Sequence, residues 1–145
     1  MRWLVLPLLL FTSCESITAT LDHVVRLDDG TAAQVMAHAR RLGEARDLEV
    51  FPHEPGPHDE LWIYPRQDLS RPTVLYRNGP WVVASQYWIN RVPGGAERDD
   101  AERFGRLVFR RLRAGFPALP NPEVHYWARS EEHPEPPQRP WEAKD

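Results

Sequence analysis

The strongest constraint on the fold of this chain is a central block of four short runs rich in β-branched and aromatic residues. The runs are separated by loops that contain proline or glycine, and they cover 48–51, 61–64, 73–77 and 81–92. Residues of these types favour strands, and runs of this length are typical of strands rather than helices. The central block is therefore predicted to form four strands.

A further strand and a helix are predicted before this block. Residues 21–27 have the pattern of a strand, and Asp28-Asp29-Gly30 is a turn signal. Thr31 to Arg46 begins with the Thr31 to Gln34 spacing of a capping box. The apolar residues that then recur at helical intervals are Val35, Met36, Ala39 and Leu42. This segment is predicted to be an amphipathic helix.

A second helix is predicted from Ala96 to Gly115. Its first turns are acidic and its last turns are rich in arginine, as the helix macrodipole favours. Gly115 and Pro117 end it. Between the third and fourth central runs, Asn78-Gly79 indicates a tight hairpin, and because Pro80 lacks an N–H group, Tyr76 and Trp81 are predicted to form its last ladder pair.

The end of the chain is rich in proline, with seven prolines among its last thirty residues. Residues 129–145 are predicted to be a flexible tail, and a polyproline-type ligand segment ending at Trp141 is the alternative. A short strand over Glu123 to Trp127 stays open. The fold predicted over 21–128 is a single small α+β domain of order β-α-β-β-β-β-α, a mostly antiparallel sheet of about five strands with two helices on one face.

The first fourteen residues have the features of a signal peptide. Arg2 precedes an apolar run over 3–11, which is followed by Thr12-Ser13-Cys14. Nine apolar residues in a helix span about 14 Å, roughly half of a bilayer core, so a transmembrane helix is a poor interpretation. The run Phe11 to Cys14 resembles the lipobox of bacterial lipoproteins, with Phe11 in place of the usual leucine.

This resemblance implies a signal peptide over 1–13, a covalent lipid on Cys14 that includes palmitate-type acyl chains, and a tether over 14–20. The residue after the cysteine is Glu15 rather than Asp, which implies an outer-membrane address that faces the periplasm. An ordinary secretory signal, or a cytosolic protein with an apolar first segment, is the alternative.

Composition excludes several function classes. The only lysine is Lys144, so neither a buried Schiff-base lysine nor a phosphate-loop lysine is available. After loss of residues 1–13 the chain carries 17 basic and 21 acidic side chains. This acidic balance removes the electrostatic basis for binding nucleic acid. Apart from the lipid, no cofactor is expected.

One loop gathers candidate metal ligands. His53, His58 and Asp59 lie within seven residues of one another, and imidazole with carboxylate suits a divalent transition metal. The intervening Pro-Gly-Pro forces a loop, and a solvated loop is the simpler interpretation. A small periplasmic metal-dependent enzyme or metal-binding protein that uses His53 to Glu60 is therefore the alternative function, and no G-x-S-x-G motif supports a serine hydrolase.

Aromatic residues at strand positions are the candidates for a binding surface, since aromatic side chains often anchor protein interfaces. Tyr87 shares this setting, and the candidates are Trp62, Tyr64, Tyr76, Trp81 and Trp88. The arginines over 103–113 form either a solvated helix face or a surface for acidic groups. The leading hypothesis is a non-enzymatic, lipid-anchored envelope protein that binds a protein or envelope component, as an immunity-type inhibitor or an assembly accessory.

Overall fold

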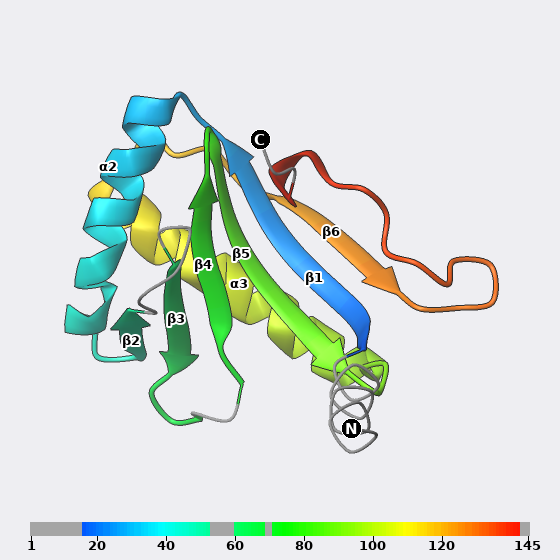
Figure 1. Cartoon of the computed structure of the whole chain (residues 1–145). Helices are drawn as coiled ribbons and strands as arrows, with labels where there is room; N and C mark the ends of the chain where they lie inside the picture. The colour runs from blue at the N-terminus through cyan, green and yellow to red at the C-terminus, as the bar shows by residue number, and fades with distance from the viewer. Residues whose placement is uncertain (1–15, 53–59, 69–70, 143–145) are drawn as a thin grey trace, which may run out of the picture.

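The computed structural model describes residues 16–52, 60–68 and 71–142 and shows one α+β domain (Figure 1). Its antiparallel sheet has six strands in the order β2-β3-β4-β5-β1-β6. The strands are β1 (Ile17–Arg26), β2 (Leu48–Pro52), β3 (Glu60–Pro65), β4 (Thr73–Asn78), β5 (Trp81–Ile89) and β6 (Glu123–Ala128). The helices are α2 (Asp29–Ala39), α3 (Gly95–Gly115) and the short 3-10 helices η1 (Arg40–Glu44) and η2 (Pro140–Glu142).

The predicted α+β class and its antiparallel sheet are confirmed, and the number of strands is corrected from about five to six. The added strand, β6, pairs with β1 over the register from Ala19↔Ala128 to Val24↔Glu123. Strand β1 also begins at Ile17, inside the segment assigned to a tether, because Ala19 and Thr20 are buried between β5 and β6. At Ala19 and Thr20, β1 therefore has a paired strand on each side, which explains why it begins earlier than predicted.

In the hairpin between β4 and β5, the residue paired with Trp81 differs by two positions from the prediction. Asn78, and not Tyr76, is the last residue paired with the strand that begins at Trp81. Gly79 has a φ of 58° and takes the first position of the two-residue loop, where a turn with positive φ favours glycine. Pro80 takes the second position, so no backbone N–H is needed from it, and its carbonyl accepts from Leu27 N–H at 2.7 Å.

The first helix begins earlier and ends earlier than predicted. Its N-cap is Asp28, whose carboxylate accepts from the Thr31 N–H at 2.8 Å and from the Thr31 hydroxyl at 2.7 Å. A side-chain acceptor at this position satisfies backbone donors of the first turn. After Ala39 the chain tightens into the 3-10 helix η1, whereas α3 begins at Gly95 and ends at Gly115, within one residue of the prediction.

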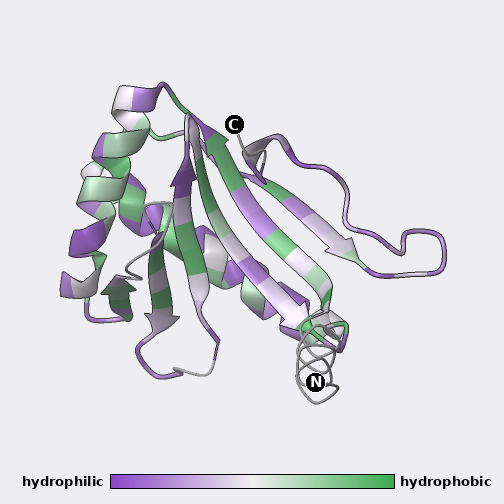
Figure 2. Cartoon of the chain, viewed as in Figure 1, coloured by the Kyte–Doolittle hydropathy of each residue, from purple (hydrophilic) through white to green (hydrophobic). Residues whose placement is uncertain are grey.

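Both helices pack on the same face of the sheet and form the main core with it. Apolar and polar bands alternate along the strands (Figure 2), because successive side chains of a strand point to opposite faces. The buried residues of this core include Val35 and Met36 of α2, Phe109 and Leu112 of α3, and Leu61, Ile63, Leu75 and Val82 of the sheet. Among the described residues, no helix is long and apolar enough to span a bilayer.

One histidine lies inside this interface. His23 of β1 is fully buried, and neither ring nitrogen has a hydrogen-bond partner among the described residues. Its ring packs against the backbone of α3 at Gly105, where a Cβ would lie 2.3 Å from the imidazole. Burial lowers the pKa of His23, and the charge of Glu102 partly opposes that shift. Gly105 therefore leaves the space beside α3 that the imidazole ring of His23 occupies.

The predicted flexible tail is wrong as far as Glu142. Residues 130–142, called here the C-terminal strap, run back beside β6, and their end at η2 lies over the face of the sheet that carries no helix (Figure 1). Arg139 and Trp141 are only 8% and 5% exposed, respectively. Trp141 packs against Val24 and Val83, so the second face of the sheet has a small core of its own.

Candidate binding face of the sheet

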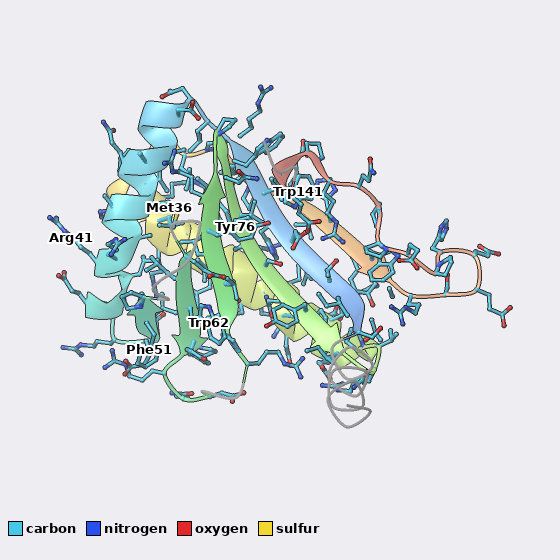
Figure 3. The ribbon with its side chains drawn as sticks, viewed as in Figure 1. Met36, Arg41, Phe51, Trp62, Tyr76 and Trp141 are labelled. Atoms are coloured by element: carbon cyan, nitrogen blue, oxygen red, sulfur yellow. The ribbon has the colours of Figure 1, made fainter. Side chains whose placement is uncertain are left out.

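The face of the sheet opposite α2 and α3 carries a run of aromatic side chains. Strand alternation and the registers of β2 to β5 place them on this one face. Figure 3 shows Phe51, Trp62 and Tyr76 on successive strands, beside Trp141 of the strap. The aromatic face is defined here as Phe51, Trp62, Tyr64, Tyr76 and Tyr87.

Exposure is greatest at the two sides of this face. Phe51 is 49% exposed and Tyr87 is 42% exposed, while Trp62, Tyr64 and Tyr76 are partly buried. Phe51 lies directly across from Trp62 in the β2–β3 register. It also meets Tyr64 edge to face, with ring centroids 5.7 Å apart, an arrangement that aromatic pairs favour. The aromatic side chains are thus held in fixed positions while part of their surface contacts water.

The strap covers the neighbouring part of the face through a buried ion pair. The Arg139 Nη1 atom lies 2.6 Å from Oδ2 of Asp22, which is fully buried in the middle of β1. Trp141 Nε1 donates to the same oxygen at 3.2 Å, and Arg139 also donates to the Thr20 hydroxyl. Asn78 in turn donates to the Trp141 carbonyl at 2.7 Å. These contacts fix the boundary between the covered and uncovered parts of the face.

Tyr76 lies at this boundary. Burial raises the pKa of its hydroxyl, and the charges of Asp22 and Glu142 raise that pKa further. Burial also raises the pKa of Glu142, against the effect of Arg139. The phenol therefore stays neutral at physiological pH, so it offers a hydrogen-bonding group and an apolar ring rather than a nucleophile or a base.

Two of the five predicted aromatic candidates, Trp81 and Trp88, are not part of the aromatic face as defined above. Trp81 shares the face but sits beneath the strap, with its ring centroid 5.9 Å from that of Trp141. Trp88 points to the helix side and is 3% exposed, with Nε1 donating to Glu97 and Arg71 stacked 5.4 Å from its ring. Strand alternation explains the separation, because Trp88 is an odd number of positions from Trp81. Trp88 is thus a core residue and does not belong to the aromatic face.

The other predicted site residues lie outside the described residues. These are Cys14, and His53, His58 and Asp59 of the candidate metal loop. Within residues 16–52, 60–68 and 71–142, no three His, Cys, Asp or Glu side chains are placed to hold a metal ion. The candidate metal loop therefore stays a sequence hypothesis.

The arginines of α3 line a second surface feature. A hollow of about 510 Å³ lies between α3 and the segment before β6, with Arg103, Arg106, Arg110 and Arg113 around it. Arg106 pairs with Glu102 at 2.6 Å, and Arg113 Nε donates to the Leu119 carbonyl at 3.0 Å. Part of this positive charge is thus neutralised or used to hold the segment that leads to β6.

Sequence reasoning missed Phe51 and the pair Asp22–Arg139. Phe51 precedes Pro52 at the end of a short edge strand, and nothing in its local pattern distinguishes a buried phenylalanine from an exposed one. Asp22 did carry a signal, because a carboxylate between buried strand residues needs a partner. The partner, 117 residues away in the proline-rich tail, has no local signature.

No protein-family model matches the chain, and no curated protein or solved structure matches it either. The geometry of the chain itself is the basis for its functional interpretation.

Proposed function

We propose that this chain is a lipid-anchored protein of the bacterial cell envelope, facing the periplasm from the outer membrane, and that it acts as a non-enzymatic binding module. The aromatic face would capture an envelope protein. One observation carries the proposal: aromatic side chains on β2 to β5 stay partly exposed on the face that the helices leave open.

The chemistry of this face suits a protein partner. Aromatic residues are enriched at the centres of protein interfaces, where they bury much area with little loss of side-chain freedom. The edge-to-face pair of Phe51 and Tyr64 presents a fixed apolar surface, and the Tyr76 and Tyr64 hydroxyls supply polar groups. A partner with an apolar anchor residue would displace water from this surface.

The anchor is supported by the residues before the domain. Phe11-Thr12-Ser13-Cys14 resembles a lipobox, and β1 begins three residues after Cys14. Intact-mass measurement and detergent partitioning of the full-length protein, beside Cys14→Ala, test this part. Acyl chains on Cys14 and loss of detergent partitioning in the variant support the anchor, whereas an unmodified, water-soluble full-length protein would refute it.

The binding role is tested by photocrosslinking in intact cells. A photoreactive phenylalanine analogue is placed at Phe51 or Tyr87, and at Gln34, an exposed residue of α2, as the matched control. We expect one discrete adduct from the two face positions and none from position 34.

A second variant separates binding from folding. Tyr64→Ser, combined with the crosslinker at position 51, should remove the adduct while the thermal midpoint of the domain changes little, since Tyr64 is only partly buried. Adducts that are equal at positions 51, 87 and 34, or that survive Tyr64→Ser, would count against binding through this face.

A further inference from the structure

Three exposed aliphatic side chains lie at the end of the domain where β1 begins. Ile17, Ile89 and Val92 are 41%, 42% and 48% exposed. Ile17 and Ile89 are cross-strand partners in the β1–β5 register, and Val92 follows in the segment that joins β5 to α3. These three residues are called the end patch. Exposed aliphatic side chains gathered at one place indicate a surface that contacts something other than water.

The position of the end patch relative to Cys14 identifies its partner. Only Glu15 stands between Cys14 and Ser16, the first described residue. Because consecutive Cα atoms are 3.8 Å apart, the Cα of Cys14 lies within about 8 Å of that of Ser16. Ser16 itself accepts a hydrogen bond from Asn90 N–H at 3.3 Å. A lipid on Cys14 would therefore bring this end of the domain to the bilayer surface.

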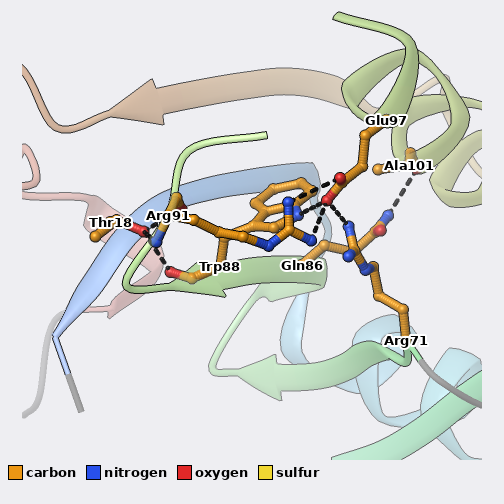
Figure 4. A network of polar contacts seen from close by, with 7 residues as sticks. All are labelled: Thr18, Arg71, Gln86, Trp88, Arg91, Glu97 and Ala101. Atoms are coloured by element: carbon orange, nitrogen blue, oxygen red, sulfur yellow. Dashed lines mark hydrogen bonds and ion pairs between the residues drawn. The ribbon is translucent and has the colours of Figure 1, made fainter. Parts of the chain in front are cut away.

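A polar network beside the end patch ties the segment between β5 and α3 to its neighbours (Figure 4). Arg91 forms two hydrogen bonds with the Glu97 carboxylate, at 2.9 and 2.7 Å, and Trp88 and Arg71 donate to the same carboxylate. Hydrogen bonds from these side chains lower the pKa of Glu97 to about 2.

The same segment is also tied to β1. The Thr18 hydroxyl donates to the Trp88 carbonyl at 3.1 Å and accepts from the Arg91 N–H at 3.1 Å. Val92, between Arg91 and the buried Pro93, is thus held outward and cannot readily fold back into the core.

The charge beside the patch also suits a lipid surface. Arg129 is exposed, its guanidinium donates to the Ile17 carbonyl at 3.2 Å, and no described carboxylate pairs with it. Aliphatic side chains with a nearby guanidinium match the boundary between acyl chains and anionic headgroups. The aromatic face lacks this composition and lies along the side of the sheet.

From these observations we infer that the end patch is a membrane-contact surface, on which Ile17, Ile89 and Val92 insert into an anionic phospholipid layer. The inference rests on the lipid anchor of the proposed function. It fixes the orientation of the domain, with the strands rising from the bilayer and the aromatic face turned sideways toward partners in the periplasm.

Depth-dependent quenching tests this surface. The full-length lipidated protein is reconstituted in vesicles of phosphatidylethanolamine and phosphatidylglycerol that contain nitroxide-labelled lipids. A fluorophore is attached at Val92→Cys, or at Ala33→Cys on α2 as a control beyond the opposite end of β1. An acylated Cys14 has no free thiol, so each variant takes one label, and its intact mass reports the acylation.

We expect nitroxide lipids to quench the label at position 92 several-fold more than the label at position 33. Ile17→Ser with Ile89→Ser should remove most of this difference, whereas Phe51→Ser, which alters an equally exposed apolar residue away from the patch, should leave it unchanged. Equal quenching at both positions in a protein with acylated Cys14 would overturn the inference and leave the anchor standing. An unacylated Cys14 would overturn both, and loss of crosslinking at the aromatic face would affect neither.

Discussion

Removal of the Arg139 side chain should be among the most damaging single changes to this domain. Arg139→Ala would leave the Asp22 carboxylate fully buried with only the Trp141 Nε1 donor at 3.2 Å. Breaking a buried ion pair by removing one partner costs about 3–5 kcal/mol. If the strap detached, water would reach Asp22, so the loss of stability in Arg139→Ala cannot exceed the free energy with which the strap docks. Docking buries Trp141, and truncation of a buried tryptophan alone costs a similar ~3–5 kcal/mol.

Urea unfolding followed by far-UV circular dichroism measures this loss. For an m-value near 2 kcal/mol/M, a loss of 3–5 kcal/mol lowers the midpoint by about 1.5–2.5 M. Arg41→Ala is the matched control, because Arg41 is an exposed arginine of η1, and its loss should change the free energy of unfolding by less than about 0.5 kcal/mol.

A double-mutant cycle then separates the ion pair from general damage to the strap. Asp22→Asn with Arg139→Met removes both charges. The stability lost in this double variant should be about 2 kcal/mol smaller than the sum of the losses in Asp22→Asn and Arg139→Met alone. If Arg139→Ala behaves like Arg41→Ala, or if the two changes are additive, the buried pair does not hold the strap and the reasoning is wrong.

Three further predictions concern the interior and the polar network. Because burial lowers the pKa of His23, the unfolded state binds the proton more readily than the folded state. The free energy of unfolding should therefore be greatest above about pH 6.5 and fall by at most about 1.4 kcal/mol per pH unit below it. Urea titrations over this range should show a weaker pH dependence of stability in His23→Leu, and an unchanged pH dependence would contradict the assignment. Gly105→Ala, with its Cβ 2.3 Å from the His23 ring, should destabilise by about 1–3 kcal/mol, and thermal midpoints should show that His23→Ala offsets part of that loss rather than adding fully to it. For Glu97, with a pKa of about 2, the stabilising charge is present above the usual carboxyl pKa and lost as pH falls from about 4.5 toward 2. Glu97→Gln should reduce hydrogen-exchange protection of the Asn90 and Arg91 amides, which donate to Ser16 and Thr18. Full protection of both amides would argue against the network as the support of that segment.

Local signals were enough to predict the helices and the central strands. The apolar spacing in α3 and the charge distribution along it placed both of its ends within one residue. The capping of α2 was misplaced because Asp28 and Thr31 both suit an N-cap, and only the hydrogen bonds of the folded chain show that Asp28 takes this role. The hairpin was misplaced because the sequence Asn-Gly-Pro allows two turns, and the ladder with β5 selects the one that starts at Gly79.

Long-range contacts were beyond local patterns. The strap looks disordered in composition, yet Arg139 and Trp141 are ordered by Asp22 on a strand near the other end of the chain. The aromatic face was predicted in part, because period-two alternation sorts residues by face but does not say which face the strap will cover. Trp81 and Tyr87 both lie on the helix-free face, but Trp81 packs against Trp141 of the strap whereas Tyr87 is 42% exposed.

The place of β1 in the sheet has a consequence for how the chain matures. Its neighbours β5 and β6 follow it by about sixty and a hundred residues, and the partner of Asp22 lies 117 residues away. The first strand to be synthesised is thus among the last to gain its neighbours, and contacts this distant in sequence make folding slow. A chain that still lacks its last residues holds no finished sheet, because β1 does not yet have β6 beside it. The domain can therefore complete its fold only after β6 and the strap have been synthesised, since both contact β1.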